Sequence, residues 1–462
     1  MKKVNKIYTF LIYVLPVVLF FSYYPIISFG KNESMNFEIS LPLIWLVIFD
    51  VLAFGILVKK RLWRIILEKW QWLLLPIFMS FSVLWSPNLA RGILTIGIVW
   101  LVYFAVFTFV ILKKEIDFPK NFKEIFWKVF FGSSLVICAW CFLQCILDVM
   151  GVSSDCTLMC RGCVSQAIGF PHPNGFAIEP QFMGNLLIAP IIMSLYFLKQ
   201  NSKNLGRKFL LLCFFIFTAT LFLTFSRGAI YACLVGLIFL TTWQIVRTKK
   251  WKVILIWPII ILAFLFTLNL QGIFAEVGPT SDTYASGVAK VLNHLSLGII
   301  DVRVKDDLDL PEVSGKTQVP SLEQKNEVEN EADFDGYVEE STEVRKKLTR
   351  DAIKVWSQDF KTTVFGVGLG GAGEALYDVG LTGSPKEIVQ NEYASLLLEV
   401  GVVGVILVIL TVVLVTRTII KSSVNVAIVT LLIAYGITLC FFSGLPNALH
   451  IYLLPALFYM IF

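Results

Sequence analysis

Apolar residues dominate the chain in long runs that short polar connections separate. An α-helix of about 20 apolar residues crosses a hydrocarbon core of roughly 30 Å, and in lipid it satisfies its own backbone polar groups. The pattern therefore predicts an all-α polytopic membrane protein with about twelve transmembrane helices. The predicted spans are residues 7–29, 39–58, 70–86, 92–112, 125–148, 180–198, 208–225, 227–246, 252–270, 392–416, 423–443 and 446–462.

Basic residues gather in every second connection, starting with the N-terminal segment. Lys and Arg in short loops are retained on the cytoplasmic side of a membrane. We therefore expect a multi-pass protein of the cell membrane with both termini in the cytoplasm. The first apolar run is too long for the hydrophobic region of a signal peptide, so we interpret it as a span. The basic stretches are residues 1–6, 59–61, 113–123, 199–208, 247–252 and 417–421.

One long polar segment, residues 271–390, interrupts the apolar pattern and is expected outside the cytoplasm. It divides the chain into helices 1–9 within residues 1–270, the extracytoplasmic loop itself, and helices 10–12 within residues 391–462. Its middle, residues 301–343, is acidic and poor in aromatic residues, which favours disorder. Residues 342–359 then show apolar positions at near-helical spacing between Lys and Arg, which predicts an amphipathic helix near the membrane surface.

The composition agrees with a membrane protein and argues against nucleic-acid binding. Hydrophobic residues make up 57% of the chain, and the mean hydropathy is +0.76, whereas soluble domains are about half apolar. The formal net charge is +6, but the long loop holds 21 acidic and 12 basic residues, a net of −9. A nucleic-acid groove would need clustered positive charge there.

Three of the nine cysteines, Cys156, Cys160 and Cys163, lie together in a predicted extracytoplasmic loop. A disulfide between two of them is expected outside the cytoplasm, and the sequence leaves the pairing open. A zinc site with His172 is disfavoured, because four ligands are usual and the other histidines, His294 and His450, are far away in the sequence. The remaining six cysteines lie in predicted spans, where they are expected to pack as small apolar residues.

Gly366, Gly368 and Gly371 match the spacing of a dinucleotide-binding fingerprint. That motif requires a surrounding βαβ unit, which the sequence does not provide. Glycine permits backbone angles that other residues adopt only at a cost. The stretch therefore predicts a tight turn or a re-entrant return into the membrane.

Two charged residues stand at the outer ends of predicted spans. Arg227 follows Thr224-Phe-Ser at the junction of two spans, where an arginine can extend its charge to the lipid headgroups or bind a phosphate with bidentate geometry. Glu179 precedes another span. Its carboxylate can cap the helix, or it can orient a hydroxyl or accept a proton.

The order of motifs resembles the O-antigen ligase and polymerase family of bacterial envelope glycan enzymes. The resemblance covers about residues 165–445 and rests on the following motifs: Thr224–Ala229, Arg345 seven residues before Ala352, Phe365–Gly370, Gln390–Tyr393 and Leu398–Gly404.

This resemblance implies a metal-independent glycosyltransferase of the GT-C type, without a cofactor, that inverts the transferred sugar. Its donor would be a glycan on undecaprenyl diphosphate, and its partners would be membrane lipid and a chain-length regulator or flippase. Arg227 and Arg345 would bind the diphosphate and stabilise its charge as it leaves, with Arg350 as the alternative to Arg345. The remaining expected contacts to substrate are His172, Asn391, Gly366 and Gly368.

One departure from the family affects the mechanism. Ligases of the family usually have His-Asn where this chain has Gln390-Asn391. In the family that histidine is expected to activate the acceptor hydroxyl by accepting its proton, and glutamine cannot accept a proton at neutral pH. The polymerase branch is therefore slightly favoured over a ligase that attaches a finished glycan to a lipid or protein. Gln390 remains an expected site residue, and Glu392, Glu179 and His172 remain candidates for the base.

A polysaccharide or lipid transporter is the alternative from another class. Twelve spans with both termini inside are common among carriers, but carriers build a mid-membrane site from internal repeats, and no repeat is evident here. Asp50 and Glu399 are the notable charged residues in predicted spans.

Overall fold

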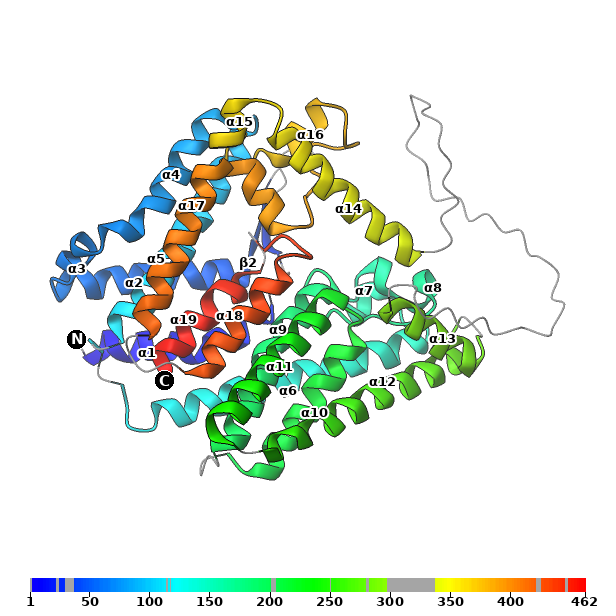
Figure 1. The fold of residues 1–462 in the computed structure, drawn as a ribbon. Coiled ribbons are helices and arrows are strands. Elements are labelled where there is room, and N and C mark those ends of the chain that lie inside the picture. The colour runs from blue at the N-terminus through cyan, green and yellow to red at the C-terminus, as the bar shows by residue number, and fades with distance from the viewer. Residues whose placement is uncertain are drawn as a thin grey trace.

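The computed structural model is a helical bundle with one small sheet (Figure 1). It describes residues 2–21, 25–29, 37–113, 115–116, 118–200, 205–249, 251–279, 282–296, 337–420, 425–444 and 448–462. The helices of the first half are α1 (Lys2–Leu19), α2 (Leu41–Lys59), α3 (Trp63–Glu68), η2 (Trp70–Leu73), α4 (Leu74–Ser82), η3 (Val83–Trp85), α5 (Leu89–Leu112), α6 (Phe122–Val149), α7 (Ser154–Thr157), η4 (Arg161–Cys163), α8 (Ser165–Ile168), α9 (Pro180–Gln200), α10 (Arg207–Leu223) and α11 (Arg227–Thr248). Those of the second half are η5 (Trp251–Ile256), α12 (Trp257–Val277), α13 (Tyr284–Leu295), α14 (Tyr337–Trp356), α15 (Phe360–Phe365), α16 (Ala372–Asp378), α17 (Glu392–Ile420), α18 (Val426–Thr438) and α19 (Leu449–Ile461).

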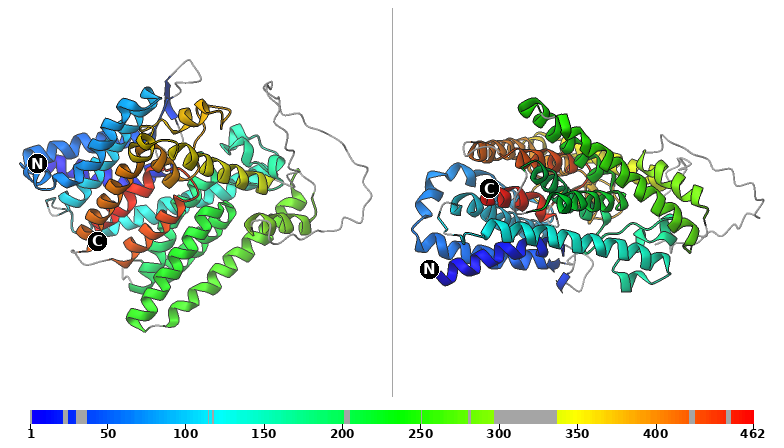
Figure 2. Two further views of the ribbon diagram at one scale, coloured as in Figure 1. Left: turned by 45° about the horizontal axis from the view of Figure 1, so that its top comes forward. Right: turned by 90° about the horizontal axis from the view of Figure 1, so that it is seen from below.

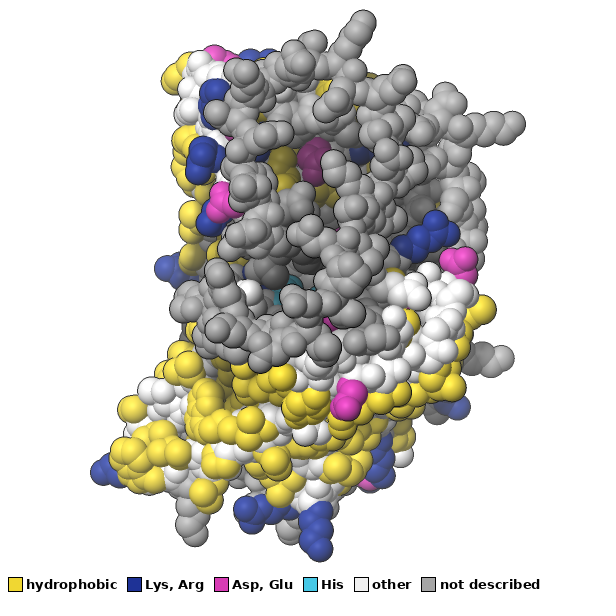
Figure 3. Space-filling model, turned by 90° about the vertical axis from the view of Figure 1, so that its right-hand side faces the viewer, with side chains coloured by type: hydrophobic (Ala, Val, Ile, Leu, Met, Phe, Trp, Pro, Cys, Tyr) yellow, Lys and Arg dark blue, Asp and Glu magenta, His cyan; other side chains and the backbone are white. Residues whose placement is uncertain are grey.

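The helices confirm a polytopic membrane protein. Among the described residues, seven helices are long and apolar enough to cross a membrane, namely α2, α5, α6, α9, α11, α12 and α17. Shorter apolar helices cover Asn5–Leu19, Trp70–Trp85, Val426–Thr438 and Leu449–Ile461. The exposed surface is correspondingly apolar: Ile261, Leu262 and Leu265 of α12 are more than half exposed, and Figure 3 shows a broad hydrophobic band on one face of the molecule.

The first predicted span, residues 7–29, is wrong at its C-terminal end. Helix α1 ends at Leu19, and residues 25–29 form strand β1 (Pro25–Phe29), which pairs antiparallel with β2 (Phe37–Ser40). Pro25 is the first residue of β1, a position at which its missing backbone N–H is tolerated. The all-α expectation is therefore corrected by one two-stranded sheet among the described residues.

A second group of helices, α14, α15 and α16, lies over one end of the bundle (Figures 1 and 2). They have a small core of their own with the start of α17, formed by Ala352, Val355, Ala372, Leu376, Val389, Ala394 and Leu398. Helix α14 confirms the helix predicted at residues 342–359. It begins at Tyr337, so the last residues of the segment expected to be disordered are helical; residues 301–336 lie outside the described part of the chain.

Helix α9 is the centre of the bundle. Within its apolar window 89% of the residues are buried, and it packs against α6, α10, α11, α18 and α19. A lipid-facing helix would leave one side exposed, so α9 is surrounded by protein. Helix α9 therefore fixes the positions of the neighbouring helices, including the junction between α10 and α11 that lies beside its own N-terminal half.

Candidate active site

The junction between α10 and α11 carries Arg227 in a tightly packed turn. Phe225 has a positive φ of 50°, and Thr224 Oγ1 donates a hydrogen bond of 2.7 Å to the carbonyl of Leu221. The turn packs closely on α9, because a Cβ atom added to Gly184 would lie 2.9 Å from the Cβ of Ala229. Arg227 is consequently held, half-buried, as the first residue of α11.

The loop between α18 and α19, residues 439–444, contacts this junction from the other side. A Cβ on Gly228 would lie 2.9 Å from the Cβ of Phe441. The carbonyl of Phe441 accepts hydrogen bonds from Gln181 Nε2 of α9 at 3.1 Å and from Arg345 Nη1 of α14 at 3.4 Å. The 439–444 loop thus joins the α10–α11 junction to helix α14.

The positive charges of Arg227 and Arg345 both affect the pKa of one histidine, His294. Burial, together with the positive charges of Arg227 and Arg345, lowers the pKa of His294 to about 4. Both guanidinium groups therefore lie within electrostatic reach of the same side chain, although they are separated by more than a hundred residues in the sequence. The structure brings together the two arginines that the motifs singled out.

Arg350, the alternative to Arg345, is differently placed. Five residues along an α-helix correspond to a rotation of about 140° from Arg345. Arg350 is exposed, whereas Arg345 is half-buried. The contact with Phe441 is made by Arg345.

Glu392, at the start of α17, is bound by the same 439–444 loop. Its carboxylate accepts hydrogen bonds from Ser443 Oγ and the Gly444 backbone, both at 2.8 Å, and from the Tyr452 hydroxyl at 3.4 Å. Its backbone N–H donates to the carbonyl of Leu439 at 2.9 Å. With both oxygens engaged, Glu392 fixes the loop that holds Arg345.

The other polar residues predicted for the site are near helix starts. Glu179 is exposed and immediately precedes α9, and its carbonyl accepts hydrogen bonds from the first turn of that helix. Asn391 Oδ1 accepts a hydrogen bond of 3.1 Å from Ala394 N and so caps α17. Gln390 lies next to this cap and is partly buried.

The glycine-rich stretch docks into a break in α17. Gly401 has φ 62° and ψ −170°, and the carbonyls of Leu398 and Glu399 accept hydrogen bonds of 2.9 Å from Val367 N and Gly368 N. A Cβ on Gly366 would lie 2.3 Å from the Glu399 carbonyl oxygen. The turn expected at Gly366 and Gly368 is confirmed, and it supplies donors to carbonyls that the broken helix leaves without partners.

The two histidines expected to be unrelated are neighbours. The rings of His172 and His294 lie 5.5 Å apart, because the segment before α9 and helix α13 both pack over the α10–α11 junction, where each ring contacts Phe225. The argument from sequence distance was therefore wrong for His294.

Residues 212–409 match the family model described as O-antigen ligase. These residues, which make up less than half of the chain, are similar to the O-antigen ligase family. No curated protein matches the chain. The O-antigen ligase match includes Arg227, Arg345 and Glu392, whereas His172 and the 439–444 loop lie outside the matched residues.

The sequence did not predict the 439–444 loop, because residues 423–443 form one apolar run that predicts a span. Helix α18 ends at Thr438. A signal was present in Ser443-Gly-Leu-Pro446, since glycine and proline close together mark a turn. Cys440, expected to pack inside a span, is exposed in this loop.

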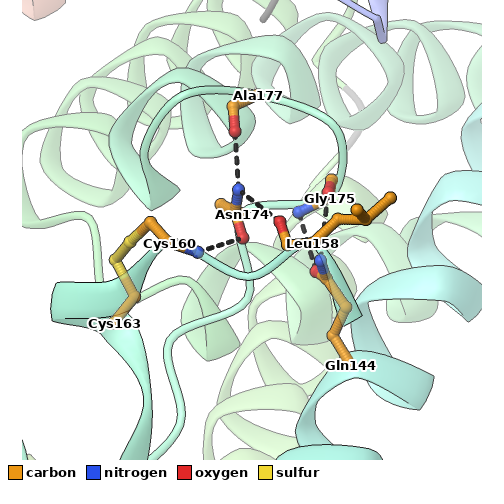
Figure 4. The surroundings of a disulfide bond; sticks show 7 residues. All are labelled: Gln144, Leu158, Cys160, Cys163, Asn174, Gly175 and Ala177. Carbon is orange, nitrogen blue, oxygen red and sulfur yellow. Dashed lines mark hydrogen bonds between the residues drawn. A yellow bond between two sulfur atoms is a disulfide. The ribbon is translucent and has the colours of Figure 1, made fainter. Parts of the chain in front are cut away.

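The expected disulfide is confirmed as Cys160–Cys163, and Cys156 is free and exposed. Asn174 ties the disulfide loop to the segment before α9: its Oδ1 accepts a hydrogen bond from Cys160 N, and its Nδ2 donates to the carbonyls of Leu158 and Ala177 (Figure 4). The disulfide therefore stabilises the segment that carries His172.

A membrane-impermeant maleimide applied to intact cells should label Cys156 in a Cys440→Ser background without reductant. We expect one label per chain, because Cys156 is the exposed free thiol of this loop and the neighbouring pair is oxidised. Cys156→Ser should remove it, and replacing Cys160 and Cys163 should lower stability by about 2 kcal/mol. Three labels before reduction would contradict the pairing, and no label would contradict the external placement.

Proposed function

We propose that this protein is a glycosyltransferase that acts on the extracytoplasmic side of the cell membrane and takes its glycan from undecaprenyl diphosphate. The observation that carries the proposal is that the α10–α11 junction, which presents Arg227, packs against Phe441, whose carbonyl accepts a hydrogen bond from Arg345. Two arginines at the end of a membrane bundle suit a diphosphate at headgroup level, because each guanidinium can donate two parallel hydrogen bonds to phosphate oxygens.

The reaction places negative charge on the diphosphate as its bond to the sugar breaks. Arg227 also begins α11, whose N-terminal backbone N–H groups and dipole favour an anion at the same point. These cations and dipoles would stabilise the leaving group directly. We therefore propose a metal-independent transfer, with inversion at the anomeric carbon when a hydroxyl attacks from the opposite face.

The membrane arrangement in this proposal has twelve spans, with both termini in the cytoplasm and α14–α16 outside. Helices occupy each of the twelve apolar ranges, and basic residues lie in alternate connections. In Figures 1 and 2 the two termini lie toward the same end of the bundle, which agrees with this arrangement.

Within the family we favour the polymerase branch, because Gln390 stands where ligases carry a histidine. The transporter alternative is weakened at Glu399, one of the two notable charged residues in the predicted spans. Its carboxylate is hydrogen-bonded to the backbone at Gly370 and Ala372 and is attracted by Arg91. Glu399 thus anchors the glycine-rich turn and does not line a transport path through the membrane.

The direct test is to incubate purified protein in lipid nanodiscs with a single lipid-linked repeat unit. A polymerase gives a ladder of lipid-linked products with successive repeats. One glycan transferred to a different lipid or protein acceptor, without a ladder, would assign the ligase branch. If no product forms but the lipid crosses the bilayer of proteoliposomes, the transferase proposal is wrong and the transporter is supported.

A further inference from the structure

Two buried imidazoles lie directly beside the proposed diphosphate site. His172 is 8% exposed and His294 is 7% exposed. Phe170 and Phe225 enclose His172, with ring centroids 4.6 Å and 5.0 Å from its own. Both imidazoles therefore have fixed positions next to the α10–α11 junction that presents Arg227.

The two rings differ in their hydrogen bonds. His294 Nε2 donates to the carbonyl of Phe225 at 3.1 Å, so this nitrogen is occupied. His172 Nε2 is buried and has no hydrogen-bond partner among the described residues. A buried polar atom without a partner costs about 1–3 kcal/mol, which points to a ligand that completes it.

The backbone around His172 is held on both sides. His172 N donates to the carbonyl of Cys163 at 2.8 Å, and the carbonyl of Pro171 accepts a hydrogen bond from Gln271 Nε2 at 3.4 Å. The disulfide loop and α12 thus keep the main chain in place. Within this ordered segment, Nε2 of the His172 imidazole lacks a hydrogen-bond partner among the described residues.

We propose that His172 is the catalytic base of this enzyme and accepts the proton of the acceptor hydroxyl, a step that Gln390 cannot perform. The inference rests on the proposed function and adds a residue outside the matched family domain. Glu392 is less suited to this step, since three donors already occupy its carboxylate.

The step balances without a further reactant. The acceptor, a sugar hydroxyl of a second lipid-linked unit, gives its proton to His172 Nε2 while its oxygen forms the bond to the anomeric carbon. The bond from that carbon to the diphosphate breaks, and its electron pair leaves with the diphosphate, next to Arg227 and Arg345. His172 then releases the proton to water.

A bound donor should make His172 a stronger base, because the diphosphate offsets nearby positive charges that lower the pKa of His172. Burial, His294 and Arg227 lower the pKa of His172 well below its usual range. The other charged groups facing this region are Arg345, which acts on His294, and Lys290, which is near Gly169 and paired with Asp282. A bound diphosphate offsets the positive charge of the arginines and so raises the pKa of His172 toward neutrality.

The test combines His172→Gln with pH–rate profiles of the full-length protein in nanodiscs. Turnover by His172→Gln should fall by about 10²–10⁴-fold, while the affinity for undecaprenyl diphosphate stays within about twofold, as expected for a residue that serves the acceptor. In the unmodified protein the acid limb of kcat should lie at higher pH than that of kcat/KM for donor, because kcat reports the donor-bound state. The acid limb of kcat should be absent from His172→Gln.

His294→Gln serves as the matched comparison, because its imidazole is hydrogen-bonded to the backbone and should not carry the proton. This variant should keep the acid limb. The inference is overturned if His172→Gln retains the limb or near-normal turnover, if it loses donor affinity in proportion to turnover, or if the unmodified protein shows no acid limb. Failure of the unmodified protein to transfer any glycan would instead overturn the proposed function.

Discussion

Replacing Arg227 with alanine should reduce glycan transfer by roughly 10²–10³-fold or more, the loss seen when one preorganised donor to a developing anion is removed. Arg227 is held at the first position of α11 by packing against α9 and Phe441, so it is preorganised before substrate binds. Arg345→Ala should have a similar effect, because its guanidinium reaches the same region through Phe441. Product is measured as lipid-linked glycan made by purified protein, at equal protein levels.

Arg247→Ala and Lys354→Ala are the matched controls. Arg247 lies at the opposite end of α11, and Lys354 is an exposed residue in the last turn of α14. Both variants remove one positive charge from the same helices and should retain normal transfer. Normal product length and amount from Arg227→Ala and Arg345→Ala would exclude these residues from the reaction.

Gly401→Ala should destabilise the protein by about 3 kcal/mol or more, since backbone strain of this kind costs 1–3 kcal/mol and overpacking adds a similar amount. The φ of 62° and ψ of −170° belong to a region that is essentially restricted to glycine. The new Cβ would also lie 2.5 Å from the carbonyl oxygen of Val364 and 2.6 Å from Gly366 N. The glycine-rich turn and the broken helix could not then remain docked.

Folded yield in detergent and the midpoint of thermal unfolding measure this effect. Gly97→Ala is the control, because Gly97 lies within α5 and an added Cβ would meet no atom within 4 Å. It should leave stability unchanged or raise it by up to about 1 kcal/mol, as alanine favours a helix. Equal unfolding midpoints for the two variants would show that the break at Gly401 is not needed for folding.

Most of the membrane-spanning helices could be predicted from sequence, because a run of apolar residues is a local property that lipid selects directly. Prediction failed where tertiary contacts end a helix or break it. Helix α17 changes direction at Gly401, where the turn at 366–368 supplies hydrogen bonds from another part of the chain. Similarly, α18 ends early because residues 439–444 bind Glu392.

The candidate site could be predicted only in part. Motif order identified Arg227 and Arg345, but the choice between Arg345 and Arg350 needed the contact with Phe441. His172 and His294 are separated by more than a hundred residues, so their proximity is a property of the fold alone. The sequence likewise could not distinguish a proton-accepting role for Glu392 from its observed role as an anchor of the loop.

Binding of undecaprenyl diphosphate tests the central claim most directly, namely that Arg227 and Arg345 hold one diphosphate. Affinity for this lipid and for undecaprenyl phosphate is measured with the unmodified protein, each single alanine variant and the double variant. We predict a preference for diphosphate, a loss of that preference in each single variant, and a coupling between the two substitutions of about 0.5–3 kcal/mol. Unchanged diphosphate affinity in the single variants, or strictly additive effects in the double variant, would contradict the account.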